Sequence, residues 1–458
     1  MSTGQKRIIA IAVVVVIAVA GVGGAILLTQ RGISYVTPGV TGVPDSQIIK
    51  VGVLDDMTDS TGKGSWQGSW LAAYEINTAG GVVVNGTHYY FGLISEDTSE
   101  AAAFLDTSKG VAAAQKIISV DGAQFLTGGF RTESLKAYIE TVMDHKLIFI
   151  GTGAATDYFC QNVLDSHSRY QYFFRDQPIN STSLGSSAIT ELAVLRNVIA
   201  AMAFGGNTSM VKHWAVLREA LDWTVPMDNA LKAYMGAIGW DPTPVQDIAF
   251  PMTADSTAFS GYWTAINGSK AQVVIPIISA QGGVLMDTQY NATRPQCLIC
   301  GINVPSQLQS FWTDTAGKCM YEVVLQTFVR HNKTVYTIPF WDHYLGNFSA
   351  VPIYTSAGGY DAITLLRYAI NQTQSFTNYK LVAALETINK ANPITGVAGK
   401  AAFTRSHDLS YGWPYGVPIF AQWQSGGNKP CITSGGALYP NYIVTGSLML
   451  PPQGINKL

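Results

Sequence analysis

A chain of 458 residues, 47% of them hydrophobic, is long enough for two lobes of ordinary domain size with a core in each. The charged fraction is 13% and the formal net charge is −2. No run of Lys and Arg lies beyond the N-terminus, and this excludes nucleic acid as a partner, because neutralising phosphates requires clustered cations.

The N-terminal segment is the most apolar part of the chain. Residues 8–28 are apolar throughout and follow Lys6 and Arg7. About 20 such residues match the thickness of a bilayer core. Residues 1–29 are therefore a transmembrane anchor or a signal segment, and we favour a retained anchor with the remaining chain outside the cell. Residues 30–47, with several Gly and Pro, form a flexible tether.

A strand, a polar loop and a helix follow the tether. Ile49–Leu54 is a short β-branched run typical of a strand buried on both faces, and 55–64 is a polar turn. From Ser65 onward apolar residues recur at helical spacing until Gly80 and Gly81 end the helix. In open α/β sheets, ligands lie at the carboxyl ends of such strands.

The same alternation continues along the chain and predicts a parallel, doubly wound sheet. Later segments indicate more helices, followed by β-like stretches near the C-terminus. The expected strands are 89–94, 124–128, 147–150, 213–217 and 272–278, and the expected helices are 101–119, 134–144, 183–202, 227–238, 259–267, 319–329, 359–370 and 381–389.

The first helix carries a family signature. Its matching residues are Gly62, Gly68, Leu71, Ala72, Glu75, Ile76, Asn77 and Ala79-Gly80-Gly81. The chain resembles the leucine/isoleucine/valine-type substrate-binding proteins of ABC importers, within the type I periplasmic binding proteins. From residue 48 onward the order of further motifs fits the same family: Gly128 to Ile150, Gly153-Ala154-Ala155-Thr156, Phe173-Phe174-Arg175, Tyr360-Asp361-Ala362, and Phe403 to Leu409 with His407 where glycine is usual.

The resemblance implies an α/β fold of two lobes, each a doubly wound parallel sheet with helices on both faces, joined by three hinge crossings. Lobe 1 is then 48–175 and 301–395, and lobe 2 is 176–300 and 396–458. With the N-terminal transmembrane helix, this gives a tethered receptor with a cleft between its lobes.

The resemblance also implies a ligand site on lobe 1. There the hydroxyls and N–H groups of Thr132, Ala154 and Thr156 hold a ligand carboxylate, as helix N-termini can. Thr132 and Thr156 are equally compatible with plain helix N-caps. Arg131 either clamps a carboxylate or forms a surface ion pair. The family's Pro-Leu-Thr-Gly loop is Asp56-Met57-Thr58-Asp59 here, so Thr58 and Asp59 change the first ligand contact.

Lobe 2 is expected to supply aromatic walls. Trp223 falls on the family's tyrosine-bearing loop, with a buried core ring as the alternative, and Tyr360 is a second candidate wall. Asn303 stands where amino-acid-binding members carry an acid for the ligand ammonium. Either Asp222, Asp59 or Asp56 replaces that acid, or the ligand is an amide, a urea-like molecule, a carboxylate or another small polar metabolite.

The predicted function is an extracellular receptor that binds a small solute by hinge closure and delivers it to an ABC permease. The alternative is a ligand-sensing ectodomain of a signalling system. An enzyme is disfavoured because nucleophile-elbow, His-Glu-x-x-His and P-loop motifs are missing from the sequence. No cofactor is expected, and the spacing of the seven His along the chain indicates no metal site.

The cysteines and the Asn-x-Ser/Thr sequons indicate in which cellular compartment the protein is expected. Cys297 and Cys300 are half of a zinc or redox motif without a second pair, so a structural disulfide or buried thiols are expected among the five cysteines. Asn-x-Ser/Thr sequons behind an export segment favour a glycosylated cell surface, for example an archaeal one. The eight candidates are Asn85, Asn180, Asn207, Asn267, Asn291, Asn332, Asn347 and Asn371.

Overall fold

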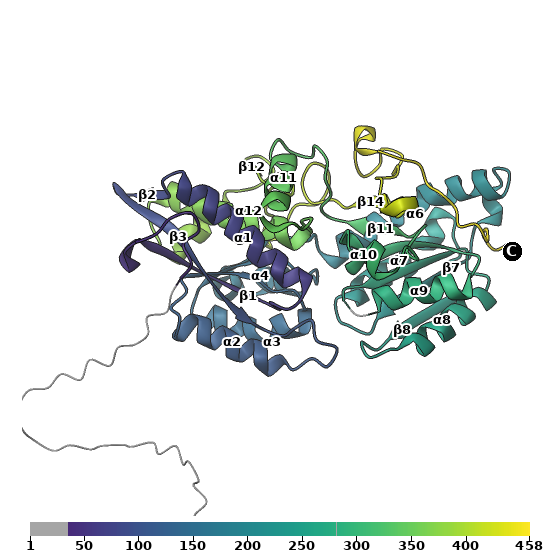
Figure 1. Cartoon of the computed structure of the whole chain (residues 1–458), viewed down its shortest axis with the longest axis horizontal. Coiled ribbons are helices and arrows are strands. Elements are labelled where there is room, and N and C mark those ends of the chain that lie inside the picture. Colours follow the sequence, from purple (N-terminus) through teal and green to yellow (C-terminus); the bar gives the residue numbers. More distant parts are fainter. Residues whose placement is uncertain (1–34, 281) are drawn as a thin grey trace, which may run out of the picture. The chain divides into compact units, whose positions relative to one another are not determined.

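Two mainly parallel sheets of six strands each organise residues 35–280 and 282–458, the part of the chain that the computed structural model describes (Figure 1). The expected anchor at 1–29 and the first part of the tether lie outside the described residues. The flexible tether expected up to residue 47 is wrong from Tyr35 onward, because Val36 and Leu93 exchange main-chain hydrogen bonds and the buried Tyr35 hydroxyl donates to the Asp121 carbonyl. We name the two halves after their sheets: lobe 1 holds β1–β6 and lobe 2 holds β7–β11 and β14. The expected α/β fold with two parallel-sheet lobes is confirmed.

The sheet of lobe 1 has the order β2-β3-β1-β4-β5-β6. All its neighbours are parallel except β2 and β3, which form a hairpin. Asn85 and Gly86 turn that hairpin at φ 48° and 80°, the left-handed conformation that an Asn-Gly pair predicts. The strands are β1 Ile48–Asp55, β2 Val82–Val84, β3 Thr87–Asp97, β4 Phe125–Gly128, β5 Ile148–Gly151 and β6 Phe173–Arg175.

Helices cover both faces of this sheet. Figure 1 shows α2 and α3 on one face and α1 and α12 on the other. A Cβ at Gly68 of α1 would lie 1.9 Å from the Ser356 carbonyl oxygen of α12, so this signature glycine allows the two helices to approach closely. The helices of lobe 1 are α1 Ser60–Thr78, α2 Thr107–Ser119, α3 Thr132–Asp144, α4 Tyr158–Asp165, α5 His167–Tyr170, α11 Thr337–Phe348, α12 Tyr354–Thr373 and α13 Asn378–Glu386.

The sheet of lobe 2 has the order β14-β11-β10-β9-β7-β8. Only β14 is antiparallel to its neighbour. The strands are runs of β-branched and aromatic residues, almost all buried except in β8 at the edge, as expected for strands covered on both faces. They are β7 Trp214–Glu219, β8 Gln246–Phe250, β9 Val273–Ile278, β10 Leu298–Asn303, β11 Val323–Gln326 and β14 Ile419–Gln422.

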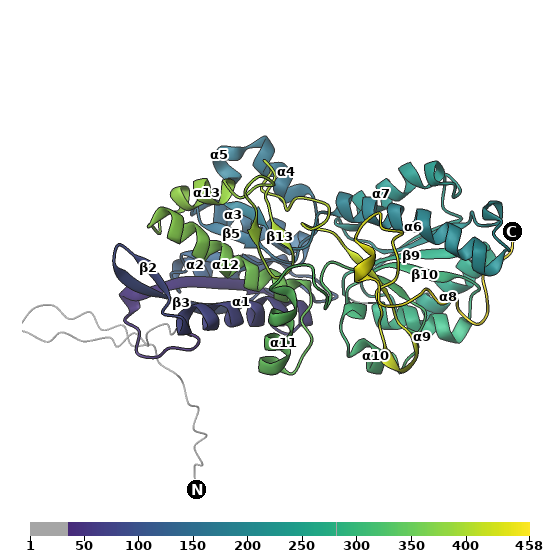
Figure 2. The same cartoon turned by 90° about the horizontal axis from the view of Figure 1, so that it is seen from above.

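Two helix pairs sandwich the sheet of lobe 2. In Figure 2, α6 and α7 lie on one side of β9 and β10, and α8 and α9 lie on the other. α6 is long and apolar enough to cross a membrane by length and composition, but Leu192, Leu195 and Ile199 belong to the lobe 2 core. The helices are α6 Ser181–Ala203, α7 Thr224–Tyr234, α8 Ser256–Gly268, α9 Gly283–Thr293 and α10 Phe311–Asp314.

The division of the chain between the sheets differs from the expected boundaries. Strand β11 pairs with β10, so the sheet of lobe 2 continues to Gln326 instead of ending at residue 300. The helix expected at 319–329 was wrong: β11 occupies its centre, because a four-residue apolar run fits either period. Ala401 and Phe403 belong to the lobe 1 core, next to the hairpin of β12 (Ile394–Thr395) and β13 (Lys400–Ala401).

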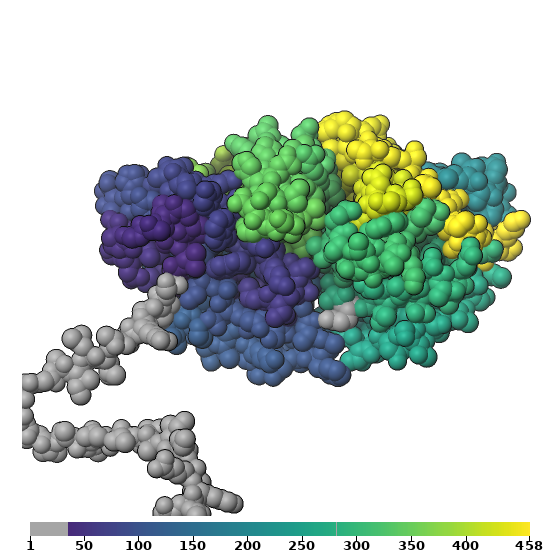
Figure 3. Space-filling view, in the orientation of Figure 1, coloured from purple at the N-terminus to yellow at the C-terminus, as the bar shows by residue number. Residues whose placement is uncertain are grey.

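The C-terminal segment is attached to lobe 2 through Asn456. The Asn456 main-chain N–H donates to the Gln296 carbonyl at 2.7 Å, and its side-chain Nδ2 donates to the Ala271 carbonyl at 2.8 Å. Figure 3 shows the C-terminal residues, in yellow, running along the surface. The segment thus packs on lobe 2, and in the described part of the chain no strand follows β14.

All five cysteines are described, buried and free, so the buried-thiol alternative is confirmed. Cys297 packs in the core under α8 and α9, whereas Cys300 packs in the core under α6 and α7. The two thiols of the half-motif therefore point to opposite faces of one sheet, which a strand imposes on residues three apart.

Candidate ligand-binding site

A cavity of about 500 Å³ lies where strands of both sheets end. Its walls come from residues that follow the carboxyl ends of β4, β5, β6, β7, β9, β10 and β11, which is the position the fold predicts for a ligand. Those residues are Phe130, Gly153, Pro178, Trp223, Ser279, Val304 and Thr327.

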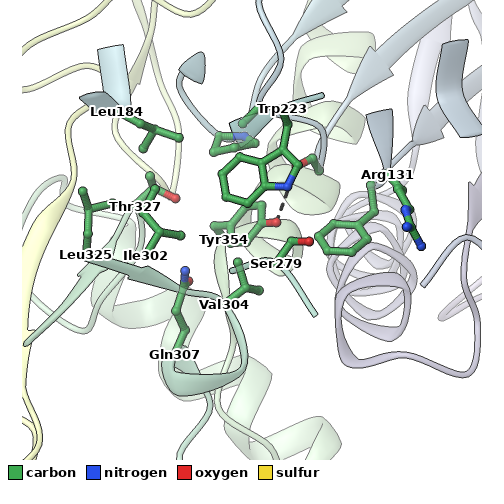
Figure 4. Close-up of a pocket in the computed structure, with 14 residues that line it drawn as sticks. Arg131, Leu184, Trp223, Ser279, Ile302, Val304, Gln307, Leu325, Thr327 and Tyr354 are labelled. Atoms are coloured by element: carbon green, nitrogen blue, oxygen red, sulfur yellow. Dashed lines mark hydrogen bonds between the residues drawn. The ribbon is translucent and has the colours of Figure 1, made fainter. Parts of the chain in front are cut away.

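Most of the wall is apolar. Trp223, at the start of α7, is 7% exposed, and its ring faces Ser279 and Tyr354 (Figure 4). The Tyr354 hydroxyl donates to the Gly153 carbonyl at 3.4 Å, the dashed line in Figure 4. Leu184, Ile302, Val304 and Leu325 complete this part of the wall. A ligand that fills the cavity must therefore present substantial apolar surface.

A few polar groups on the wall have no protein partner. The main-chain N–H groups of Arg131, Gly153 and Ala155 donate to no acceptor among residues 35–280 and 282–458. The side-chain oxygens Thr327 Oγ1 and Gln307 Oε1 are buried without a hydrogen bond in the same part of the chain. Buried donors without partners are costly, so these groups are suited to bind polar atoms of a ligand.

A carboxyl group stands directly behind the wall. Glu219, at the end of β7, is fully buried and accepts hydrogen bonds from Ser279 Oγ at 2.6 Å, from Ala280 N at 3.1 Å and from Trp223 Nε1 at 3.4 Å. Burial raises the pKa of Glu219 to about 7, although the hydrogen bonds from Ser279 and Ala280 lower it. The carboxyl thus orients two wall residues.

Arg131 lines the cavity, but its guanidinium points away from Trp223 and Ser279 (Figure 4). Nη1 donates to the carbonyl oxygens of Ala102 at 2.7 Å and Glu100 at 3.3 Å, and Nε lies 3.6 Å from Glu133 Oε2. The side chain is 7% exposed and anchors the 100–102 loop. The expected ion pair with a nearby acid is therefore confirmed with Glu133, although Arg131 is buried and not at the surface.

The three lobe 1 residues expected to hold a carboxylate lie beside the cavity wall. Thr132 begins α3 and is 1% exposed. The Ala154 N–H already donates to the Gly129 carbonyl at 2.8 Å, and Thr156 Oγ1 accepts from Tyr158 N at 3.4 Å. Of the two expected N–H donors, Ala154 is therefore occupied, whereas Thr156 N donates to no acceptor among the described residues, like the wall groups Gly153 N and Ala155 N.

Asn303 and Tyr360 are directed elsewhere. Asn303 lies between two wall residues of β10 and the following loop, Ile302 and Val304, but its Nδ2 donates to Glu322 Oε1 at 2.9 Å inside lobe 2. The Tyr360 hydroxyl donates to Glu75 Oε2 at 2.5 Å, and its ring packs edge-on against Phe340. Neither residue is among those lining the cavity.

Thr58 and Asp59 serve the loop before α1. Thr58 Oγ1 donates to Asp56 Oδ1 at 2.6 Å. Asp59 caps α1 and accepts from Thr61 N at 2.8 Å. Asp56 in turn accepts from Ala101 N at 2.9 Å. These groups fix the loop and do not line the cavity.

Polar contacts connect the lobes beside the cavity. Lys136 Nζ of α3 lies 2.7 Å from Asp222 Oδ2, which precedes α7. The Asp222 N–H donates to Glu133 Oε1 at 2.9 Å. We call these three residues the interlobe contact. They hold the edge of α3 against the loop that carries Trp223.

Of the nine expected residues, the structure brings Arg131 and Trp223 to the cavity wall. Sequence reasoning missed Phe130, Tyr354, Ser279 and Thr327. The rule that ligands lie after parallel strands points to three of these, since Phe130, Ser279 and Thr327 directly follow β4, β9 and β11. Tyr354 begins α12, and no local signal identified it.

Two parallel-sheet lobes that share one apolar cavity at their strand ends define a two-lobed solute-binding protein. The family model described as "Periplasmic binding protein" matches residues 48–413. The chain belongs to this family, which consists of substrate-binding proteins, and the resemblance found in the sequence is confirmed. No curated protein sequence matches the chain at a significant level.

Solved structures with the same fold include binding proteins for different solutes. A solute-binding protein of an ABC transporter from R. palustris in complex with benzoate has TM-score 0.64 and 16% identity, covering 84% of this chain and 95% of that one. The leucine-binding protein LivK from Thermotoga maritima gives 0.66 and 15%, covering 84% and 97%. LivJ from Streptococcus pneumoniae, in complex with isoleucine, gives 0.65 and 15%, covering 83% and 97%. At such identities the similarity establishes the fold.

Proposed function

We propose that this chain is the extracellular solute-binding receptor of an ABC importer and that it captures a small carboxylate with an apolar body. The observation that carries the proposal is the cavity wall, where aromatic and aliphatic side chains surround main-chain N–H groups that have no acceptor among the described residues. Such N–H groups bind a carboxylate without a full positive charge nearby.

The wall narrows the ligand classes expected from the sequence. Urea and short amides lack the apolar part needed to cover Trp223, Tyr354 and Leu325. The two solutes named for the similar structures, benzoate and isoleucine, share a carboxylate and an apolar body. For an ammonium group in the ligand, the buried acid Glu219 lies behind the wall residue Ser279.

The ligand binds, in this proposal, by bringing the lobes together. It docks on the N–H groups of lobe 1 and contacts the rings of lobe 2 only in the closed form, so the ligand shifts the population toward closure. Bending takes place where the chain passes between the two sheets, and the closed form is delivered to a membrane permease whose ATPase drives import.

The proposed location is the outer cell surface, with the chain held by an N-terminal anchor. The exposure of the sequons is compatible with glycans there. Asn180 is a poor acceptor because its side chain caps α6 and donates to Asp408 Oδ2 at 2.8 Å, and Asn267 accepts from Gln296 N at 3.2 Å. The other six sequon asparagines are exposed: Asn85, Asn207, Asn291, Asn332, Asn347 and Asn371.

A thermal-shift screen of the full-length chain tests the ligand class. Benzoate, isoleucine, leucine, urea and acetamide are added separately, and a bound compound raises the melting temperature by mass action. We expect a shift with at least one of the apolar carboxylates and none with urea or acetamide. A shift with urea or acetamide alone would contradict the proposed ligand class while leaving the receptor role in place.

The variant Phe130→Ala checks that the cavity is the binding site. Phe130 lines it and is buried, but among the described residues it belongs to none of the contiguous hydrophobic clusters, so its truncation leaves those clusters intact. We expect the ligand-induced shift to disappear. The control Phe104→Ala removes a ring that is 84% exposed and keeps the shift. An unchanged shift in Phe130→Ala places the ligand elsewhere.

A further inference from the structure

Two histidines and a glutamate come together on lobe 1, away from the residues that line the ligand cavity. Glu386 Oε1, at the end of α13, lies 2.8 Å from His167 Nε2 of α5 and 3.1 Å from His407 Nε2 in the turn at 404–408. Among the described residues this is the one group of three or more His, Cys, Asp or Glu whose ligand atoms lie within 4.8 Å of one another. We call it the His–Glu–His cluster.

The hydrogen bond that His407 makes through Nδ1 determines whether its other ring nitrogen, Nε2, carries a hydrogen or a lone pair. His407 Nδ1 lies 3.0 Å from the Phe173 carbonyl oxygen, which only accepts, so Nδ1 carries a hydrogen. In the neutral ring Nε2 then has a lone pair and no hydrogen, and this lone pair faces the Glu386 carboxylate. Two electron-rich atoms at this distance repel each other unless Nε2 takes up a proton or a metal cation lies between them.

The ring is also held rigidly in place. His407 stacks on Phe174 with ring centroids 4.0 Å apart and planes 5° apart, and its side chain is 2% exposed. Its main-chain carbonyl accepts from Arg175 N at 2.9 Å. The backbone has φ 56°, a left-handed value at which a residue other than glycine is strained. The turn thus keeps a strained residue whose ring points at Glu386.

These features match how proteins bind zinc. A zinc-bound imidazole commonly donates its other N–H to a main-chain carbonyl, as His407 does to Phe173. Bond lengths near 2.1 Å in a tetrahedral site put ligand atoms about 3.4 Å apart, so the observed separations of 2.8 and 3.1 Å must widen by about 0.3–0.6 Å when the metal binds. Two imidazoles with one carboxylate suit zinc and its neighbours, and not magnesium or calcium.

We propose that His167, Glu386 and His407 form a site for Zn²⁺ or a similar divalent transition metal. Three protein ligands leave a fourth position open, toward a hollow bordered by Leu164, Asn389 and Arg405. The metal joins α5, α13 and the 404–408 turn, which are far apart in the sequence. It thereby stabilises the part of lobe 1 next to β6, the last strand before the chain enters lobe 2.

Metal binding to the full-length chain, prepared without a histidine tag and stripped with EDTA, tests this site. The measurements are Zn²⁺ affinity by isothermal titration calorimetry and the melting temperature with and without Zn²⁺. We expect one equivalent to bind, a higher melting temperature that EDTA reverses, and no comparable effect of Mg²⁺. His167→Asn should weaken Zn²⁺ binding by more than about 100-fold, since even outer partners of a ligand contribute about 10–100-fold.

The three substitutions in the cluster are ones that the fold tolerates, so a loss of Zn²⁺ affinity is not a consequence of unfolding. His167 and Glu386 have side chains 52% and 37% exposed, so His167→Asn and Glu386→Gln preserve the core, and His407→Gly suits the left-handed backbone. The control His343→Ala removes the histidine of a single exposed pair, His343 Nδ1 to Glu75 Oε1 at 2.9 Å, and should leave Zn²⁺ affinity unchanged. Equal affinity in wild type and His167→Asn, or an equal loss in His343→Ala, would overturn the proposal and leave the cluster as an ion-paired group.

Discussion

Glu219 is a single carboxyl group whose ionisation couples the cavity wall to protein stability. Burial raises its pKa to about 7, from the ordinary value of about 4.5 for a glutamate in the unfolded chain. A raised pKa means that the folded protein holds the proton more tightly than the unfolded chain does. Glu219 therefore contributes stability that is complete below about pH 4.5 and is lost as the pH rises through about 7.

The variant Glu219→Gln removes this dependence on pH. Between about pH 5 and pH 8, the free energy of unfolding of the variant should rise relative to wild type by about 2–3 kcal/mol, the equivalent of roughly two pKa units. Urea unfolding at both pH values measures the change, and comparing the two proteins cancels the other titrating groups. An offset between the proteins that is the same at both pH values would contradict the predicted shift.

At the residue scale, the sequence predicted which positions lie near the strand ends better than it predicted where their side chains point. Trp223 lies on the cavity wall, as the resemblance implied. Arg131, a candidate that the family pattern does not include, also lines the wall, but its guanidinium binds the 100–102 loop. Asn303 illustrates the limit: the loop position is right, but alternation along β10 turns its side chain toward Glu322. The His–Glu–His cluster was missed because its members are separated by 219 and 21 residues in the chain.

Glycines in α1 determine how closely this helix approaches α12. A Cβ at Gly68 would meet the Ser356 carbonyl oxygen at 1.9 Å and the Ser356 carbonyl carbon at 2.8 Å. Main-chain atoms inside a helix cannot move aside cheaply, so Gly68→Ala should destabilise lobe 1 by about 3 kcal/mol through overpacking. The free energy of unfolding in urea measures the loss.

The matched control is Gly261→Ala in α8. Gly261 lies within that helix, is exposed, and a Cβ there would meet nothing within 4 Å. The same substitution should therefore stabilise the protein by about 0.5–1 kcal/mol, through the better helix propensity of alanine. Similar effects of both substitutions would mean that helix propensity, and not the contact between α1 and α12, decides the outcome.

At the scale of elements the sequence predicted helices and strands where several signals agreed. The apolar run of β1 and the glycines after α1 indicated the strand and the end of the helix, whereas α1 begins at Ser60, capped by Asp59, inside the segment expected to be a polar turn. For residues 319–329 only a short apolar run was available, and pairing of Cys300 with Val323 across β10 and β11 decided the structure. Such pairing joins distant segments, so local periodicity does not reveal it.

At the scale of the whole molecule, ligand affinity depends on how readily the lobes come together. The parallel, doubly wound sheets were predictable from the βαβ alternation. The residues that touch between the lobes were not predictable, since they lie on loops and helix ends. The interlobe contact is such a set. Lys136 and Asp222 have side chains 30% and 59% exposed, so their pair contributes only about 0.2–1 kcal/mol to closure.

Lys136→Ala and Asp222→Ala should each weaken binding of the solute found in the screen by about twofold to fivefold, because less of the protein is closed at equilibrium. The double variant should lose no more than either single one, since both remove the same interaction. Calorimetric titration at low and high salt measures this, and the difference from wild type should shrink as salt screens the pair.

Lys109→Ala, an exposed lysine on α2, controls for the loss of charge. Fully additive losses in the double variant, or an equal loss in Lys109→Ala, would show that closure does not depend on the interlobe contact.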